Sequence, residues 1–320
     1  MTAPAPAPAP FDLITMGRVS VDVYPREIGV PLEEVETFGR YLGGSPTNVA
    51  VAAARHGRRA AVVTRTGDDP FGRFVHRALR GYGVDDRYVT PVPGLPTPLA
   101  FCEIFPPDDF PLYFYRAPKA PDLEISPGEL DLEAIGEARI MWATVTGLSQ
   151  RPSREATLAA LAAARGRTVL DLDWRPMLWP DPDEAGPLAR AALAHANVAV
   201  GNIDECEVAT GERDPLRAAR ALLGRGLELA IVKRGPAGVL AATADEVVEL
   251  PPVRVEVVNG LGAGDAFGGA LCHGLLSGWD LERVVAFAGA AGALVASRLA
   301  CSDAMPTEAE VDALLKEAGR

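Results

Sequence analysis

The sequence is poor in the features that mark secreted and membrane-embedded proteins. Its 320 residues include only four cysteines, and these are widely separated (Cys102, Cys206, Cys272 and Cys301). Disulfide frameworks and zinc sites need paired or closely spaced cysteines, so we expect four reduced thiols in a core. No apolar run reaches the roughly 18 residues that span a bilayer, and no basic residue followed by an apolar core opens the chain as in an export signal. We therefore expect a cytoplasmic protein with no membrane partner.

Basic charge is also scarce. Lysine and arginine number 31 against 43 aspartates and glutamates, and the net charge is −12. Affinity for nucleic acid comes largely from neutralising phosphates, so we expect no nucleic-acid partner. A small anionic ligand is still possible, but it would need a local basic pocket.

What the sequence does have is a regular alternation of short β-branched runs with Ala- and Leu-rich stretches. The runs predict core strands at Asp12–Met16, Ala61–Thr64, Ile140–Ala143, Thr168–Leu172, Val198–Val200 and Leu229–Val232. The stretches predict helices at Thr47–Arg55, Pro70–Tyr82, Arg154–Ala164, Leu216–Leu223, Ala263–Leu276 and Leu281–Ser297. Such alternation indicates an α/β fold with a mostly parallel central sheet covered by helices on both faces. Ligands of such sheets lie beyond the carboxyl ends of the strands.

Two segments, about 19–41 and 99–116, break this alternation. Both resemble strands without intervening helices and are rich in Val, Phe and Tyr. We interpret them as a small β-sheet lid that projects from the main body, covers a pocket and excludes water. The Ala-Pro repeat within residues 1–10 predicts a disordered tail, which leaves residues 11–320 as one domain.

The sharpest motif is Asn259-Gly-Leu-Gly262-Ala263-Gly264-Asp265, between a predicted strand at Val253–Val258 and a long helix. Glycines permit a tight turn in which several N–H groups point at one spot, where the positive end of the helix dipole favours an anion. A carboxylate at the same place is useful if it accepts a proton from an attacking hydroxyl. The alternative is an ordinary helix start with an aspartate in its first turn.

With Gly43-Gly44-Ser-Pro-Thr-Asn48 near the N-terminus as a second motif, the chain resembles the ribokinase-like PfkB family of carbohydrate kinases from about Phe11 to Met305. The resemblance implies a ribokinase-like three-layer sandwich that uses ATP and Mg²⁺. It also implies that Asp265 deprotonates the acceptor hydroxyl while the N–H groups of Gly262, Ala263 and Gly264 stabilise charge on the transferred phosphoryl group.

The resemblance carries over further residues, each with a simpler reading beside it. Asp22, Gly43, Gly44 and Asn48 would bind the substrate, although Asp22 alone suggests a solvated turn and Asn48 a surface position near a helix cap. Nucleotide binding is implied for four residues, although the glycines among them also fit a hairpin turn: Asn202, Lys233, Gly235 and Gly238. Glu205 would hold Mg²⁺ through water, or be an acidic residue at a helix start.

The acceptor is indicated by Asp171-Leu-Asp173-Trp-Arg175, where many sugar-acid kinases of the family have Asn in place of Asp173. This variant resembles the 5-dehydro-2-deoxygluconokinase branch of the family, which implies phosphorylation of a sugar acid at its 6-hydroxyl. Arg175 would bind a phosphate or carboxylate in two-pronged fashion, although its spacing equally fits an internal pair with an aspartate. The resemblance places Arg116 over the substrate, and two cations in one pocket would favour an acid. Asn259 replaces an aspartate found in many relatives near a monovalent-cation site, which leaves dependence on such a cation uncertain.

Several other functions compete with this one. 2-Dehydro-3-deoxygluconokinase and fructokinase share the same core, and a nucleoside kinase would leave both arginines unused. A noncatalytic sugar-sensing protein on the same fold is the alternative outside enzymes. A dinucleotide oxidoreductase is disfavoured because no Gly-x-Gly-x-x-Gly follows the first strand. An exposed lid edge could pair with a second copy, which suggests a homodimer through the lid.

Overall fold

The computed structural model describes residues 10–319 of the chain. Residues 1–9, which make up nearly all of the expected disordered tail, lie outside the described residues.

The main body is built on one nine-stranded sheet in the order β13-β12-β11-β10-β9-β8-β1-β4-β5. The strands from β11 to β5 in this order run parallel, and β12 and β13 run antiparallel at one edge. Their bounds are β1 Leu13–Met16, β4 Ala60–Gly67, β5 Val89–Val92, β8 Ile140–Thr144, β9 Arg167–Asp171, β10 Val198–Asn202, β11 Leu229–Lys233, β12 Val239–Ala242 and β13 Val247–Leu250.

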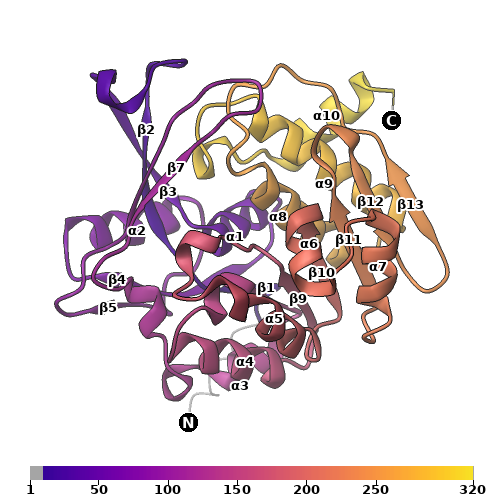
Figure 1. Ribbon diagram of the computed structural model, residues 1–320, viewed down its shortest axis with the longest axis horizontal. Coiled ribbons are helices and arrows are strands. Elements are labelled where there is room, and N and C mark those ends of the chain that lie inside the picture. Colours follow the sequence, from indigo (N-terminus) through magenta and orange to yellow (C-terminus); the bar gives the residue numbers. More distant parts are fainter. Residues whose placement is uncertain (1–9, 320) are drawn as a thin grey trace, which may run out of the picture.

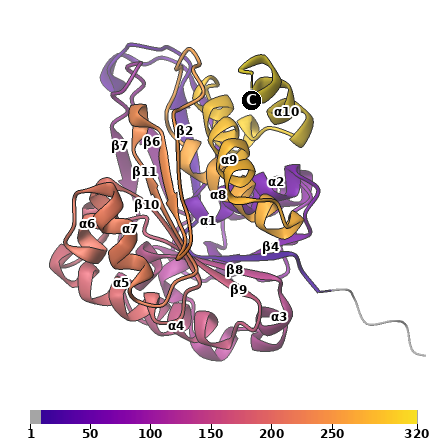
Figure 2. The same cartoon turned by 90° about the vertical axis from the view of Figure 1, so that its right-hand side faces the viewer.

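Helices cover both faces of this sheet, so the predicted three-layer α/β arrangement is confirmed (Figures 1 and 2). One face carries α1 Ser45–Arg55, α2 Pro70–Gly81, α8 Ala263–Ser277, α9 Leu281–Ala296 and α10 Glu308–Glu317. The other carries α3 Leu132–Glu137, α4 Ser153–Ala163, α5 Ala185–Leu193, α6 Ile203–Thr210 and α7 Pro215–Leu223. Short 3₁₀ turns lie at Leu32–Glu34, Pro121–Glu124, Pro127–Glu129, Val145–Leu148, Pro176–Leu178, Pro182–Glu184, Gly235–Ala237 and Ser302–Ala304. Within residues 10–319, no helix has the length and apolar character needed to cross a membrane.

The central strands form where they do because both of their faces are buried. All residues of β1 and β8 are buried, and a strand covered on both faces reads as a continuous apolar run. The six core strands and six helices predicted from the sequence are all present, with ends that differ by at most three residues. The elements α3, α5, α6, α10, β5, β12 and β13 were not predicted.

The predicted strand at Val253–Val258 is wrong. The sheet ends at β13, and Pro251 and Pro252 follow it directly; prolines lack the N–H that a strand ladder needs. The segment instead ends against α9, where the backbone N–H groups of Val258 and Asn259 both donate to the carbonyl oxygen of Ala296. The glycine-rich motif is therefore anchored to a helix end and not to the sheet.

A second, four-stranded sheet projects from the main body, as predicted from the two irregular segments (Figure 1). We call it the small sheet; its order is β3-β2-β6-β7, with bounds β2 Ser20–Pro25, β3 Phe38–Gly43, β6 Leu99–Cys102 and β7 Leu112–Tyr115. Tyr24, Cys102 and Ile104 pack with Cys301 in a separate buried cluster. This packing fixes the small sheet close to the start of α8.

Candidate active site

A polar pocket of about 160 Å³ lies where the carboxyl ends of β1, β9 and β11, the first turns of α1 and α8, and the small sheet meet. This is the edge of a parallel sheet at which ligands are expected. The residues that supply its charge come from five separate segments of the chain and are Arg18, Asp22, Asp171, Asp173, Arg175, Glu205, Lys233 and Asp265.

The first turn of α8 is shaped by Gly262, which caps the helix in the left-handed region (φ 82°). A Cβ atom on Gly262 would lie 2.8 Å from Sγ of Cys301, so both conformation and space favour glycine there. Gly264 also lines the pocket, and a Cβ on it would lie 3.2 Å from Nζ of Lys233. The start of a 15-residue helix thus faces the pocket beside a lysine ammonium, an arrangement that suits an anion.

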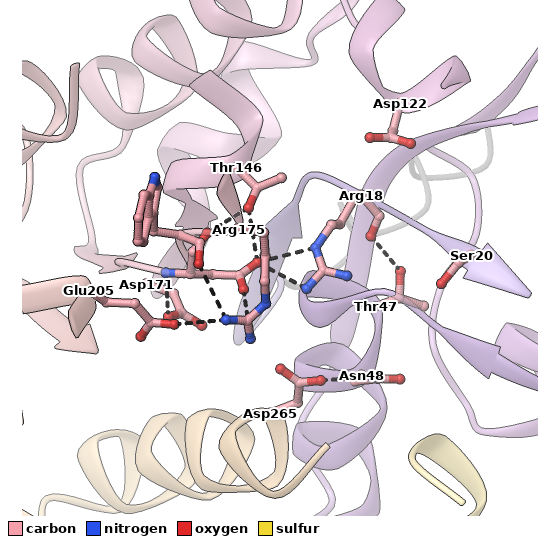
Figure 3. Close-up of polar contacts among 12 residues, drawn as sticks. Arg18, Ser20, Thr47, Asn48, Asp122, Thr146, Asp171, Arg175, Glu205 and Asp265 are labelled. Carbon is pink, nitrogen blue, oxygen red and sulfur yellow. Dashed lines mark hydrogen bonds and ion pairs between the residues drawn. The ribbon is translucent and has the colours of Figure 1, made fainter. Parts of the chain in front are cut away.

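Asp265 stands in this first turn, half-buried, with its carboxylate toward α1 (Figure 3). Its Oδ2 accepts a hydrogen bond of 2.8 Å from Nδ2 of Asn48, and Oδ1 of Asn48 accepts one of 2.6 Å from Oγ of Ser302. Burial raises the pKa of Asp265, while the Asn48 donor and the positive charge of Arg18 oppose that rise. Both ends of the Asn48 amide are therefore used to hold the carboxylate, a role that the sequence did not suggest.

The diglycine Gly43-Gly44 makes room for neighbouring parts of the same chain. A Cβ atom on Gly43 would overlap with the carboxylate of Asp22, and one on Gly44 would lie 2.5 Å from the carbonyl oxygen of Arg18. Asp22 itself accepts hydrogen bonds from the hydroxyls of Ser20 (2.7 Å) and Tyr24 (2.8 Å). Burial raises the pKa of Asp22, and these two donors oppose the rise. The glycines thus position Asp22 at the pocket wall.

A chain of alternating charges crosses the pocket (Figure 3). Nε and Nη2 of Arg18 donate to Oδ2 of Asp173 at 3.1 and 3.0 Å, and Nη2 of Arg175 lies 3.4 Å from Oδ1 of the same carboxylate. Arg175 also pairs with Oε1 of Glu205 at 3.3 Å. Burial alone would raise the pKa of Asp173, but the two arginines outweigh it and lower the pKa to about 2. Arg175 therefore forms the internal ion pair that its spacing suggested and also lines the pocket, and its role in binding the substrate stays a prediction.

Asp171 and Lys233 line the same pocket. Burial, followed by the negative charges of Asp173 and Glu205, raises the pKa of Asp171 to about 7, although Lys233 opposes the rise. Burial disfavours the charged form of Lys233, but Asp171, Glu205 and Asp265 outweigh it and raise its pKa. The lysine is thus held as a cation beside the start of α8.

Glu205 and Asn202 cap α6 reciprocally. The backbone N–H of Asn202 donates to Oε2 of Glu205 at 2.7 Å, and Oδ1 of Asn202 accepts from the backbone N–H of Glu205 at 2.9 Å. This capping box explains the Asn-x-x-Glu spacing without any ligand. Glu205 reaches the pocket as well, whereas Asn202 is not among its lining residues.

Arg116, Gly235 and Gly238 also lie outside this pocket, as do Gly43 and Ala263, which adjoin lining residues in the sequence. Arg116 was expected over the substrate, but its Nη2 pairs with the buried carboxylate of Asp122 at 2.7 Å, and it does not line the pocket. Gly235 and Gly238 form the tight turn between β11 and β12, closed by a 2.8 Å hydrogen bond from the N–H of Arg234 to the carbonyl of Gly238. For these glycines the simple hairpin interpretation describes what is seen.

Three charged residues of the pocket were not selected from the sequence as site residues: Arg18, Asp171 and Asp173. Arg18 directly follows Gly17 at the end of the first strand, and Asp171 ends a buried strand. A charged residue at the carboxyl end of an apolar parallel strand was the available signal for both.

A family model described as pfkB family carbohydrate kinase matches residues 11–308. The chain belongs to the PfkB family of carbohydrate kinases. Proteins named 5-dehydro-2-deoxygluconokinase from Listeria monocytogenes serotype 4a (strain HCC23) and Bacillus subtilis (strain 168) are 34% and 32% identical to it. The first alignment covers 96% of this chain and 97% of the relative, and the second covers 96% of each.

Solved structures give the same fold. A putative ribokinase II from E. coli in complex with ATP and Mg²⁺ has a TM-score of 0.87 at 24% identity over 96% of this chain and 99% of that one. A fructokinase with bound ATP from Xylella fastidiosa has a TM-score of 0.83 at 27% identity over 97% and 99%. The predicted ribokinase-like fold is therefore confirmed.

Proposed function

We propose that this PfkB-family kinase transfers a phosphoryl group from ATP to the 6-hydroxyl of a sugar acid, for which 5-dehydro-2-deoxy-D-gluconate is the best candidate. The observation that carries the proposal is Asp265, a carboxylate held by Asn48 at the glycine-lined start of α8, facing a pocket of hydrogen-bonding side chains.

In the proposed reaction Asp265 accepts the proton of the acceptor hydroxyl. The carboxylate is fixed by a hydrogen bond and lies at the same helix tip as the backbone N–H groups of Ala263 and Gly264. These N–H groups and the Gly262 turn favour negative charge developing on the transferred phosphoryl group. Asp22, with two hydroxyl donors holding it, is placed to accept hydrogen bonds from acceptor hydroxyls.

The residues present fit ATP and Mg²⁺. ATP supplies the phosphoryl group, and Lys233, held as a cation beside α8, would face its phosphates. Within residues 10–319 no three His, Cys, Asp or Glu side chains converge as a ready-made metal site, which agrees with the way Mg²⁺ is usually held, by one or two carboxylates, water and substrate phosphates. Both oxygens of Glu205 already have partners, so we propose that it reaches Mg²⁺ through water. For Asn202, Gly235 and Gly238 a role at the nucleotide stays a prediction.

Two observations support an acid as the acceptor. The curated relatives named above are called 5-dehydro-2-deoxygluconokinase at 32–34% identity over nearly the whole chain. The pocket also contains the guanidinium groups of Arg18 and Arg175, which suit a carboxylate. The fructokinase likeness keeps neutral ketoses as the competing acceptors.

The first experiment measures the catalytic role of Asp265. Asp265→Asn is nearly the same size and removes only the base, so we expect kcat to fall by about 10²- to 10⁴-fold while ATP still binds by calorimetry. Normal turnover in this variant would reject the assignment.

The second experiment measures which acceptor is used. ADP release is followed in a coupled assay with 5-dehydro-2-deoxygluconate, 2-dehydro-3-deoxygluconate, fructose and a nucleoside. We expect the highest kcat/KM for the first acid. Turnover of neutral sugars alone would contradict the acid reading, and binding of sugars without any turnover would favour a noncatalytic sensor.

We also expect a cytoplasmic enzyme that forms a homodimer through the small sheet. Tyr115 on the edge strand β7 is 64% exposed and Phe38 on the edge strand β3 is 38% exposed, and unpaired edges favour pairing with another strand. A sedimentation mass equal to one chain at micromolar concentration would contradict the dimer.

A further inference from the structure

The position of Arg18 in the pocket is held by contacts of both its backbone and its side chain. Its backbone is fixed because the carbonyl oxygen lies against Gly44 and accepts a 3.4 Å hydrogen bond from Oγ1 of Thr47. Its side chain is fixed by two N–H groups on one carboxylate oxygen of Asp173, and only 11% of it is exposed. A guanidinium held at both ends loses little conformational freedom when it binds a ligand.

The free side of this guanidinium faces the pocket. Nε and Nη2 point to Asp173, and in the described part of the chain Nη1 has no hydrogen-bond acceptor. In Figure 3 the guanidinium groups of Arg18 and Arg175 both lie above the Asp265 carboxylate, with Arg18 on the side of α1 and Arg175 on the side of Glu205. The group therefore has a donor left over at the place where an acceptor molecule must lie to reach Asp265.

The other candidates for binding an acid are less available. Arg116 forms an ion pair with the buried Asp122 and does not line the pocket. Arg175 lies between Asp173 and Glu205, with contacts of 3.4 and 3.3 Å to their carboxylates. Lys233 lines the pocket beside the glycines of α8.

The balance of charge makes such a cation necessary. Five carboxylates line the pocket (Asp22, Asp171, Asp173, Glu205 and Asp265) against three cations. These carboxylates would repel the carboxylate of an acidic acceptor, because like charges in a partly buried site repel strongly. The acceptor could bind only if one cation contacted its carboxylate directly.

We propose that Arg18 binds the acid group of the acceptor and determines the preference for acids over neutral sugars. This rests on the proposed function, and it assigns to Arg18 the task that the sequence suggested for Arg116 and Arg175. Asp173 then orients Arg18 through its two hydrogen bonds. This is a physical reason for an aspartate at this position, because an asparagine would provide no negative charge to pair with the arginine there.

The test compares acid and neutral acceptors in one set of variants. For wild type and Arg18→Gln, kcat/KM is measured with 5-dehydro-2-deoxygluconate and with fructose. We expect the ratio of the two values to fall by roughly 10- to 100-fold in the variant, as for loss of one hydrogen bond to a charged group, with most of the change in KM for the acid. Arg18→Lys keeps the charge without the fork and should fall between the two.

Arg18→Gln leaves Asp173 with one cation fewer, which could impair folding. The double variant Arg18→Gln/Asp173→Asn removes both charges together and keeps the pair neutral. It should show the same fall in the acid-to-neutral ratio. As a matched control, Arg116→Gln/Asp122→Asn neutralises the ion pair outside the pocket and should leave the ratio at the wild-type value.

The outcomes separate this proposal from the proposed function. If wild type phosphorylates the acid and the ratio is unchanged in Arg18→Gln and in the double variant, Arg18 is only the counter-ion of Asp173 and the assignment is overturned while the kinase function stands. A fall in the Arg116 control instead would return the acid group to Arg116. If wild type phosphorylates no acid at all, the acceptor class is wrong and the assignment of Arg18 fails with it.

Discussion

Asn48 offers the most direct test of how the candidate base is held. Its Nδ2 donates to the Asp265 carboxylate at 2.8 Å, and its Oδ1 is occupied by the hydroxyl of Ser302. Asn48→Ala removes the donor and leaves a small space in the first turns of α1. A hydrogen bond to a charged group contributes about 1.5–3 kcal/mol, so we expect kcat/KM to fall about 10- to 100-fold.

The pH profile of kcat/KM should also change in Asn48→Ala, because Asn48 affects the pKa of Asp265. Protonated Asp265 cannot accept the proton of the acceptor, so kcat/KM should fall on the acidic side of the profile. Asn48 opposes the rise in pKa that burial imposes on Asp265. Its removal should therefore raise that pKa and move the acidic limb to higher pH. The measurement is kcat/KM against pH in the wild type, Asn48→Ala and Ser302→Ala.

Ser302→Ala is the control for this experiment. Ser302→Ala keeps the donor on Asp265 and should shift the limb much less than Asn48→Ala. If Asn48→Ala raises KM for the acceptor while the acidic limb stays where it is in the wild type, Asn48 contacts the sugar, as its sequence motif suggested. The reasoning from the hydrogen bond to Asp265 would then be wrong.

Two stability predictions follow from buried contacts. Gly43→Ala should lower the free energy of unfolding by about 1–3 kcal/mol and raise KM for the acceptor, because the new Cβ would overlap with Asp22. Gly81→Ala is the matched control, since no atom lies within 4 Å of a Cβ at that position. Equal melting temperatures for the two variants would refute the argument. Burial, and then the charge of His273, lowers the pKa of His56 from 6.5 to about 4, so the unfolded chain binds this proton more readily. The free energy of unfolding should therefore fall by up to about 3 kcal/mol as pH drops from about 6.5 towards 4. Denaturant melts at several pH values should show a weaker pH dependence in His56→Leu than in the wild type. An unchanged dependence in that variant would show that His56 is not its source.

The elements that the sequence predicted well are those with a strong local signal. β1 and β8 are buried on both faces and read as unbroken apolar runs, and α8 begins at a glycine that takes a left-handed conformation. The segment Val253–Val258 has the same β-branched composition but no neighbouring strand to pair with, so composition alone gave the wrong element there. α6 was missed because it has only eight residues and begins directly where β10 ends.

The sequence by itself determined the family, the α/β layering and the position of Asp265, because these depend on local periodicity and on glycines whose backbone requirements are local. Only the tertiary structure decided which charges share the pocket. Arg18 and Asp173 are 155 residues apart and meet at the carboxyl ends of strands on either side of β8, whereas Arg116 finds Asp122 six residues away. A charged side chain pairs with whatever the fold brings within about 4 Å of it, and spacing along the chain does not contain that information.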